Sequence, residues 1–347
     1  MNHYAMTKWR SDRRINSRFI WLASHEAVET LIRKRSTDLQ WESGFFRIDE
    51  KSLPIDDVRT ANRGLVNILN SYRGDVARAL GSADSNRTRS MGHLIAFEYF
   101  SGMIAKNRDE QLLGALRALV RDEIIPRDVR RRRYRNAKRQ ASNRRQIEDL
   151  LKVCNTSNED QQDLVDISLT ATSSIDEAAE ILRRLVLSTV GFLGSAVEWL
   201  LIDSTQYSTN SPSEWFVQES LRFHSPAWRL TRSSANSSQI NGLSYSANDV
   251  FLLNIFSANR DENVWNGGDL FMPDRWSSAA ATNATLVFGK GVRSCPAQKA
   301  AVKFLEEVYD YTRNTFDIKF RKNPMSRGLV GTISAPPAGL LSLSARG

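Results

Sequence analysis

The residues with the clearest chemical potential are a cysteine in a glycine-containing loop and the basic residues around it. The segment 288–299 reads FGKGVRSCPAQK, so Cys295 follows two glycines and directly precedes Pro296. Because proline favours the first position of a helix, a helix is expected to begin at Pro296. A cysteine at that N-cap faces unpaired backbone N–H groups and the positive end of the helix dipole, which favour the thiolate. Positive charge on Arg293 and Lys290 acts in the same direction.

The thiolate is the form of cysteine that binds metal ions, so this loop is a candidate metal site. The same residues also fit a structural cysteine beside a turn, and the local pattern favours neither interpretation. The other cysteine, Cys154, has no comparable setting and is expected to be a small core residue.

A second motif lies on a predicted helix ahead of this loop. Glu219 and Arg222 are three residues apart in ESLR, a spacing that places both on one helix face and lets them pair. Arg232 and then Arg275, in the segment FMPDRW, follow before the cysteine loop. In this order the motifs resemble the cytochrome P450 family, whose pattern is a helix with ExxR, an arginine from a Pro-Glu-Arg-Phe-like segment, and a loop reading FxxGxRxCxG. The resemblance covers nearly the whole chain, although Ala297 replaces the last glycine of the loop.

The resemblance implies a haem b cofactor and a role for each motif. Cys295 would be the axial thiolate of the haem iron, with Phe288 at the start of its loop. Glu219, Arg222 and Arg275 would form a buried charge network behind the haem. Arginines would bind the haem propionates, since guanidinium groups suit carboxylates. The arginines expected there are Arg293, Arg232, Arg59 and Arg63. For the last two, a solvated basic helix face is an equal alternative.

The segment 175–201 is the longest apolar periodic stretch and is expected to form a buried central helix. The family's usual segment here carries Ala-Gly, a variable residue, an acid and then threonine. Two registers are possible, which place either Leu193 and Gly194 or Gly191 and Phe192 at the acid and threonine positions. Neither register contains the acid–alcohol pair that normally relays protons at the haem.

Proton delivery is therefore expected to be atypical. Thr189 or Ser195 could substitute from a neighbouring turn, or a substrate hydroxyl or ordered water could carry the proton. The candidate catalytic residues are Gly194, Ser195 and Thr189. The candidate walls of the substrate cavity are Gly191, Phe192, Leu193, Trp228 and Arg229. The alternative for these residues is core packing, and for Arg229 a surface salt bridge.

The resulting hypothesis is a haem-thiolate oxidase that acts on a small organic or peptide-like metabolite by monooxygenation or oxidative coupling, as in secondary metabolism. A peroxide-driven oxygenase and a haem-binding partner without catalytic activity are the alternatives. Either a free small molecule or a carrier-bound substrate would fit.

Composition limits the remaining classes of protein. The chain has 347 residues and a formal net charge of +9, and its two cysteines exclude a disulfide framework and a cysteine-rich zinc module. It shows neither an apolar signal-peptide core nor 18 uninterrupted apolar residues, so a cytoplasmic protein without a membrane span is expected. The basic run 127–145 is interpreted first as a solvated face and next as a docking site for an acidic ferredoxin-type electron donor, while nucleic acid is the least favoured partner.

A mainly α fold with small β-sheets must position these residues, in a single haem-thiolate domain over residues 1–347. Hydrophobic periodicity and turn signals delimit its elements. A strand and then a helix are expected over 19–35, helices over 57–80, 90–105, 111–125, 146–153, 175–201, 215–223 and 296–313, and strands at 239–240 and 250–254.

Overall fold

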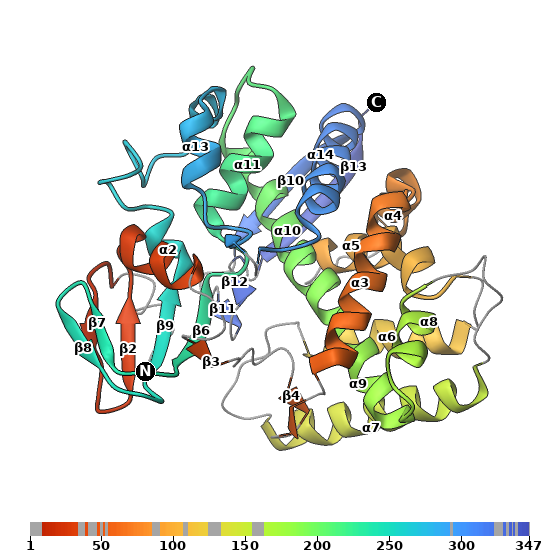
Figure 1. The fold of residues 1–347 in the computed structure, drawn as a ribbon. Helices are drawn as coiled ribbons and strands as arrows, with labels where there is room; N and C mark the ends of the chain where they lie inside the picture. The colour runs from red at the N-terminus through yellow and green to blue at the C-terminus, as the bar shows by residue number, and fades with distance from the viewer. Residues whose placement is uncertain are drawn as a thin grey trace. The chain divides into compact units, whose positions relative to one another are not determined.

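The computed structural model describes residues 9–33, 39–40, 47–48, 51–52, 55–84, 91–106, 110–123, 133–154, 163–291, 294–322, 329–330, 333–334, 336 and 339–346. The chain divides into two compact units, which are described separately. The sheet unit comprises residues 1–44, 199–310 and 322–338, and the helical unit comprises residues 45–198, 311–321 and 339–347. A mainly α fold with small sheets is confirmed (Figure 1), whereas the single domain over residues 1–347 stays a prediction.

A five-stranded sheet organises the sheet unit. Its strand order is β1-β2-β9-β6-β3, and β2 pairs with β9 in parallel while the other neighbours are antiparallel. The strands are β1 (Arg13–Arg14), β2 (Phe19–Leu22), β9 (Val250–Asn254), β6 (Arg229–Ser234) and β3 (Leu39–Gln40). The predicted strand at 250–254 is confirmed residue for residue.

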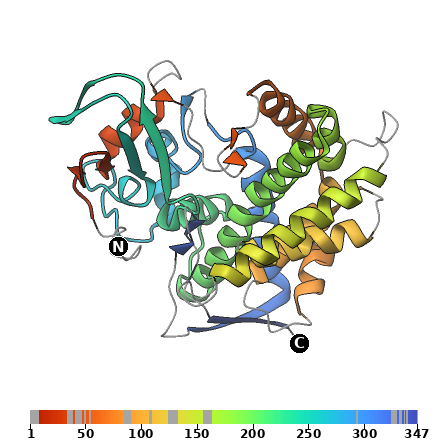
Figure 2. The same cartoon turned by 90° about the horizontal axis from the view of Figure 1, so that it is seen from below.

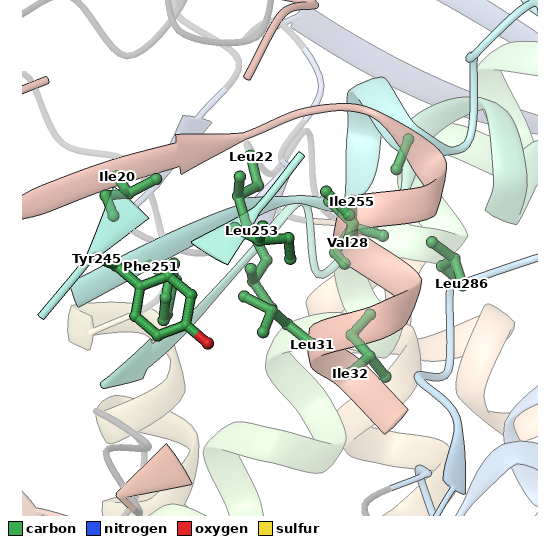
Figure 3. Packing of buried hydrophobic residues seen from close by; sticks show 13 residues of the cluster. Ile20, Leu22, Val28, Leu31, Ile32, Tyr245, Phe251, Leu253, Ile255 and Leu286 are labelled. Carbon is green, nitrogen blue, oxygen red and sulfur yellow. The ribbon is translucent and has the colours of Figure 1, made fainter. Parts of the chain in front are cut away.

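Helix α2 (His25–Arg33) covers one face of this sheet (Figure 3). Side chains alternate between the two faces of a strand. Ile20 and Leu22 of β2 therefore meet Phe251 and Leu253 of β9 on the α2 side, and all four are fully buried. Trp21 points to the opposite face and packs there with Trp228 and Ala23.

The other elements of the sheet unit carry the candidate site. Helix α11 (Ser213–His224) bears the ExxR motif, and the short helix α12 (Ile255–Ala258) follows β9. The remaining elements in this part of the chain are β7 (Ser238–Ile240), β8 (Leu243–Tyr245), the 3-10 helix η3 (Pro273–Ser277), α13 (Ala279–Ala284), α14 (Gln298–Thr315), β11 (Leu329–Val330) and β12 (Ile333–Ser334).

The helical unit is built from helices that pack along one another. They are α3 (Ile55–Ser71), α4 (Val76–Asp84), α5 (Met91–Ile104), α6 (Glu110–Glu123), α7 (Arg133–Val153), α8 (Leu164–Ala171) and α9 (Ile175–Val186), with the strands β4 (Arg47–Ile48), β5 (Lys51–Ser52), β10 (Phe316–Lys322) and β13 (Gly339–Ala345). Helix α7 lies along α6 and α9 (Figures 1 and 2).

Two predicted boundaries in this unit are wrong. The expected helix 57–80 is two helices, since Tyr72–Asp75, which includes Gly74, separates α3 from α4. A Cβ on Gly74 would collide with Tyr99, so this glycine permits close contact with α5. The expected short helix 146–153 is the end of α7, which begins at Arg133 and takes in most of the basic run.

The predicted central helix is confirmed and extended to Gln206. It consists of α9, a π-helical segment η2 (Leu187–Gly191) and α10 (Phe192–Gln206). In the described part of the chain it alone has the length and composition of a membrane span, with a mean hydropathy of 1.8, but 72% of that window is buried inside the structure. Such burial is typical of a core helix.

The central helix crosses α5 at two glycines. A Cβ on Gly194 would lie 2.5 Å from Cα and 2.6 Å from a ring carbon of His93, and a Cβ on Gly92 would collide with the Gly194 carbonyl. Close approach of the two backbones therefore requires glycine at both positions. Packing against His93 accounts for Gly194 without a ligand.

This crossing predicts opposite effects for two glycine-to-alanine substitutions. Gly194→Ala is expected to lower the free energy of unfolding by about 1–3 kcal/mol, because the added methyl group overpacks against His93. Gly114→Ala, in the exposed interior of α6 with nothing within 4 Å of its Cβ position, is expected to raise it by about 0.5–1 kcal/mol. Urea unfolding of the three proteins measures both values. A neutral Gly194→Ala variant would contradict the tight crossing.

Candidate active site

The cysteine loop is shaped by two glycines in the left-handed region. Gly289 and Gly291 both have φ of 68°, a conformation that side chains other than glycine rarely adopt. The backbone N–H of Cys295 donates to the carbonyl of Phe288 over 2.7 Å, and that of Ser294 donates to the carbonyl of Gly291 over 3.1 Å. These bonds close the loop and bring both ends of the FxxGxRxC motif together.

The position of Cys295 relative to the helix differs from the prediction. Helix α14 begins at Gln298, because Pro296 and Ala297 form a turn in which the Gln298 N–H donates to the Cys295 carbonyl over 3.4 Å. Cys295 is therefore not the N-cap residue. One backbone N–H, that of Ala297, still bonds to its sulfur.

The charge state predicted for Cys295 also changes. Burial raises the pKa of its thiol, and the hydrogen bond from the Ala297 N–H opposes that rise only in part. Lys290 adds little positive charge, because its ammonium group ion-pairs with Glu29 of α2 over 3.1 Å and donates to the Asn283 carbonyl. In the protein alone, burial thus favours the neutral thiol over the predicted thiolate.

Glu219 lies at the centre of a buried network, as predicted. It is fully buried, and its carboxylate accepts hydrogen bonds from Arg222 at 2.8 and 2.9 Å and from Arg275 at 3.1 Å. Two further donors were not predicted: the Met272 N–H at 2.7 Å and the Trp276 indole N–H at 3.0 Å. Burial alone would raise the pKa of Glu219, but these bonds and the two guanidinium charges hold it below its usual value.

The two arginines use their other donors on backbone carbonyls of the segment that precedes the cysteine loop. All five N–H donors of Arg222 are engaged, two on Glu219 and three on carbonyls at 2.7–2.9 Å. Those carbonyls belong to Asn259, Gly268 and Leu270. Arg275 likewise binds the carbonyls of Asn266 and Gly267. The network therefore fixes the path of the backbone from residue 259 to 276 against α11.

Arg232 and Arg229 point to opposite faces of β6. Arg232 is paired with Phe251 and shares the α2 side of the sheet with Leu230. Arg229 extends on the other side, where its guanidinium carbon lies 5.3 Å from the ring of Trp228. Both arginines are half-buried. The two predicted roles, a propionate for Arg232 and substrate for Arg229, thus require ligand groups on different sides of this strand.

Arg229 is not in a surface salt bridge with any described residue. Its buried Nε makes no hydrogen bond within the described chain, and burial lowers its pKa with no acidic group offsetting the effect. Trp228 is fully buried, and its ring centroid lies 6.3 Å from that of Trp21. Core packing therefore accounts for Trp228, whereas Arg229 retains unused binding capacity.

The remaining predicted residues belong to the helical unit or fall outside the described residues. Arg293 and the side chain of Arg59 fall outside them, and Arg63 of α3 is exposed. Thr189, Gly191, Gly194 and Ser195 are buried in the central helix. Phe192 and Leu193 are only half-buried although their neighbours on both sides are buried, which leaves them the best placed of the predicted wall residues to meet a ligand.

Two features of the central helix were not predicted from the sequence. The π-helical turn at Leu187–Gly191 lies directly before Phe192, and such turns are frequent at functional sites. Near its end, Asp203 accepts hydrogen bonds from Ser220 over 2.6 Å and from His224 over 2.9 Å, and the Trp199 ring stacks on His224 at 3.7 Å. Ser220 and His224 are four residues apart on α11, and this spacing could have indicated that both contact the same buried acidic residue.

The donor chemistry of the sheet unit fits haem. No group of three or more His, Cys, Asp or Glu residues that could hold a metal ion occurs among the described residues. A porphyrin supplies four ligands to its iron and requires one axial ligand from the protein. Cys295 is a free, half-buried cysteine, and coordination to a metal cation deprotonates a thiol in spite of burial.

Sequence comparison matches part of the chain to known proteins. The cytochrome P450 family model matches residues 213–302, which contain both motifs. Cytochrome P450 714C2 of Oryza sativa subsp. japonica is 30% identical over 113 residues, 31% of this chain and 22% of that protein. Cytochrome P450 119 of Sulfurisphaera tokodaii is 32% identical over 109 residues, 31% of this chain and 28% of that protein. The match thus spans between a fifth and a third of these relatives.

Structural comparison extends the likeness to nearly the whole chain. The cyanobacterial CYP120A1 with bound retinoic acid superposes with a TM-score of 0.73 at 16% identity, covering 96% of this chain and 91% of that one. A thermophilic cytochrome P450 from Sulfolobus tokodaii superposes with a TM-score of 0.69 at 16% identity, covering 100% of both chains. At these identities the likeness establishes a cytochrome P450 fold.

The fold and the match over both motifs agree. Residues 213–302 match the cytochrome P450 family model, and the chain has the fold of cytochromes P450, which are haem-thiolate proteins.

Proposed function

We propose that this protein binds haem b through Cys295 and is a haem-thiolate oxidase acting on a small organic or peptide-like metabolite. The observation that carries the proposal is the closed loop that presents Cys295 while the Glu219 network holds the preceding backbone in place. Haem bound there supplies the redox chemistry that activates oxygen or peroxide.

The residues of the sheet unit would bind and orient the cofactor. Cys295 donates the thiolate, and the Ala297 N–H, already bonded to its sulfur, would lower the electron density on that sulfur. Arg232 would bind a propionate, and Arg293, Arg59 and Arg63 remain proposed for the same function. The network of Glu219, Arg222 and Arg275 positions the loop and is not itself catalytic.

Gly191, Phe192 and Leu193 of the helical unit remain proposed as substrate-contacting residues, and so does Arg229 of the sheet unit. Phe192 and Leu193 offer apolar surface, and Gly191 allows close approach. Arg229, with its buried and unbonded Nε, suits a carbonyl or carboxylate group on the substrate. Proton delivery is proposed to use Thr189 or Ser195, or a substrate hydroxyl or water, since the helix lacks an acid–alcohol pair.

An acidic ferredoxin-type protein is the proposed electron donor, and the cytoplasm is the proposed compartment. The support is electrostatic: the chain carries a net charge of +9, and complementary charge speeds the encounter of redox partners. Either a free or a carrier-bound substrate fits this charge balance.

The test is haem loading followed by turnover. The purified chain is expected to bind one haem and, with a ferredoxin and its reductase or with hydrogen peroxide, to convert a metabolite that perturbs its Soret band. Mass spectrometry of the product then separates oxygen insertion from coupling. Turnover with peroxide alone would identify a peroxide-driven oxygenase.

Two results would overturn the proposal. Failure to bind haem would remove its basis altogether. Stoichiometric haem without consumption of oxygen or peroxide would identify the alternative, a non-catalytic partner, with which the missing acid–alcohol pair is compatible.

A further inference from the structure

A cluster of arginines surrounds one carboxylate where α7 packs against α9 in the helical unit. Glu180 of α9 is 1% exposed and accepts a hydrogen bond from Arg183 over 2.6 Å and another from Arg184 over 2.5 Å. Arg144 of α7 lies within ion-pair distance of the same carboxylate, at 3.8 Å. Three guanidinium groups therefore lie around one buried carboxylate.

Two of the three guanidinium nitrogens of Arg184 make no hydrogen bond to any described residue. Arg184 is 2% exposed, and only its Nε is bonded, to Glu180. Both terminal nitrogens, Nη1 and Nη2, are buried and make no hydrogen bond to any described residue. Leaving the buried donors of a charged group without hydrogen bonds costs free energy. A ligand that accepts hydrogen bonds from both nitrogens would remove that cost.

The charges and the burial around Arg184 lead to the same conclusion as its unbonded nitrogens. Burial lowers the pKa of Arg184, the bond and charge of Glu180 raise it, and the charges of Arg183 and Arg144 lower it again, with a net lowering. Arg184 is thus destabilised by its own surroundings even with Glu180 in place. An anion is the ligand that a buried guanidinium group with two unbonded nitrogens binds best.

We propose that the cluster of Arg144, Arg183 and Arg184 binds an oxyanion between α7 and α9. The two terminal nitrogens of a guanidinium group match two oxygens of a carboxylate or phosphate in a bidentate pair. Bound there, the anion neutralises Arg184 and links α7 to the start of the central helix. The site is independent of haem binding, and its ligand class is a small free oxyanion, with inorganic phosphate as the probe.

The test is thermal unfolding of the full-length, haem-loaded protein in sodium phosphate and in sodium chloride at equal ionic strength, with titration calorimetry of phosphate. The unaltered protein is expected to unfold about 3 °C or more higher in saturating phosphate. Arg184→Met keeps the apolar length of the side chain and is expected to abolish that difference and to weaken phosphate binding at least about tenfold.

Two further variants keep the result interpretable. Arg117→Met, which removes a half-exposed arginine bonded to Glu98 in α6, is expected to leave the phosphate response unchanged. Glu180→Gln removes the competing carboxylate and is expected to tighten phosphate binding, a readout that holds if Arg184→Met fails to fold. An equal phosphate response in all variants would overturn the proposal, as would an unaltered protein that unfolds identically in both salts.

Discussion

Replacement of Cys295 by serine is expected to abolish the thiolate-type Soret band of the reduced, carbon monoxide-treated protein. The thiolate donates electron density to the iron, and a serine hydroxyl at the same place does not ionise at neutral pH to take over that role. The loop itself should survive, because its closing hydrogen bond uses the backbone N–H of residue 295 and the Phe288 carbonyl. The measurement is the reduced carbon monoxide difference spectrum.

Cys154 provides the matched control for that experiment. It follows α7 directly, in the helical unit, and is the only other cysteine of the chain. Cys154→Ser is expected to keep the thiolate-type band at full intensity. A band that persists in Cys295→Ser, or one that disappears in Cys154→Ser alone, would show that the ligand has been assigned to the wrong cysteine.

Glu219→Gln is expected to lower the free energy of unfolding by about 3–5 kcal/mol. The substitution leaves the fully buried Arg222 without its counter-charge, and removing one partner of a buried ion pair costs that much. The amide also cannot accept all of the five hydrogen bonds that the carboxylate receives. Denaturant unfolding monitored by tryptophan fluorescence gives the value.

An exposed ion pair provides the control for the size of this change in stability. Asp149 and Lys152 lie 2.8 Å apart with side chains 71% and 60% exposed, so Asp149→Asn is expected to change stability by less than about 1 kcal/mol. A Glu219→Gln variant as stable as Asp149→Asn would mean that solvent reaches the network and that it does not anchor the backbone.

The network around Glu219 was predicted from the resemblance of the motifs, in their order along the chain, to the cytochrome P450 family. ExxR fixes two charges on one helix face, and each must find a partner when the helix is buried. The central helix and β9 could also be predicted, because long apolar periodicity and a short apolar run bounded by polar residues are strong local signals. The central helix and β9 are determined by residues close together in the sequence.

The parts that could not be predicted depend on contacts between distant segments. The local sequence does not indicate that Lys290 forms an ion pair with Glu29. The positive charge of Lys290 was therefore expected to favour the thiolate of Cys295. Gly194 was predicted to be a catalytic residue, and nothing in the local sequence indicates that His93 lies against it. Helix α14 begins two residues later than predicted. Cys295 therefore lies before a turn instead of at an N-cap, and burial is the main influence on the pKa of its thiol.

The parallel pairing of β2 with β9 has a consequence for biosynthesis. Phe19 lies opposite Val250, so the first strand leaves the ribosome about 230 residues before its partner. At about 5–20 residues per second, the apolar segment FIWL waits roughly 10–50 s for β9 to be made. Much of the intervening chain, residues 45–198, belongs to the helical unit and can form its local contacts meanwhile. Nascent chains that stall before residue 250 would therefore carry helices with local contacts and an apolar strand that lacks its partner β9, the kind of segment that chaperones shield from aggregation.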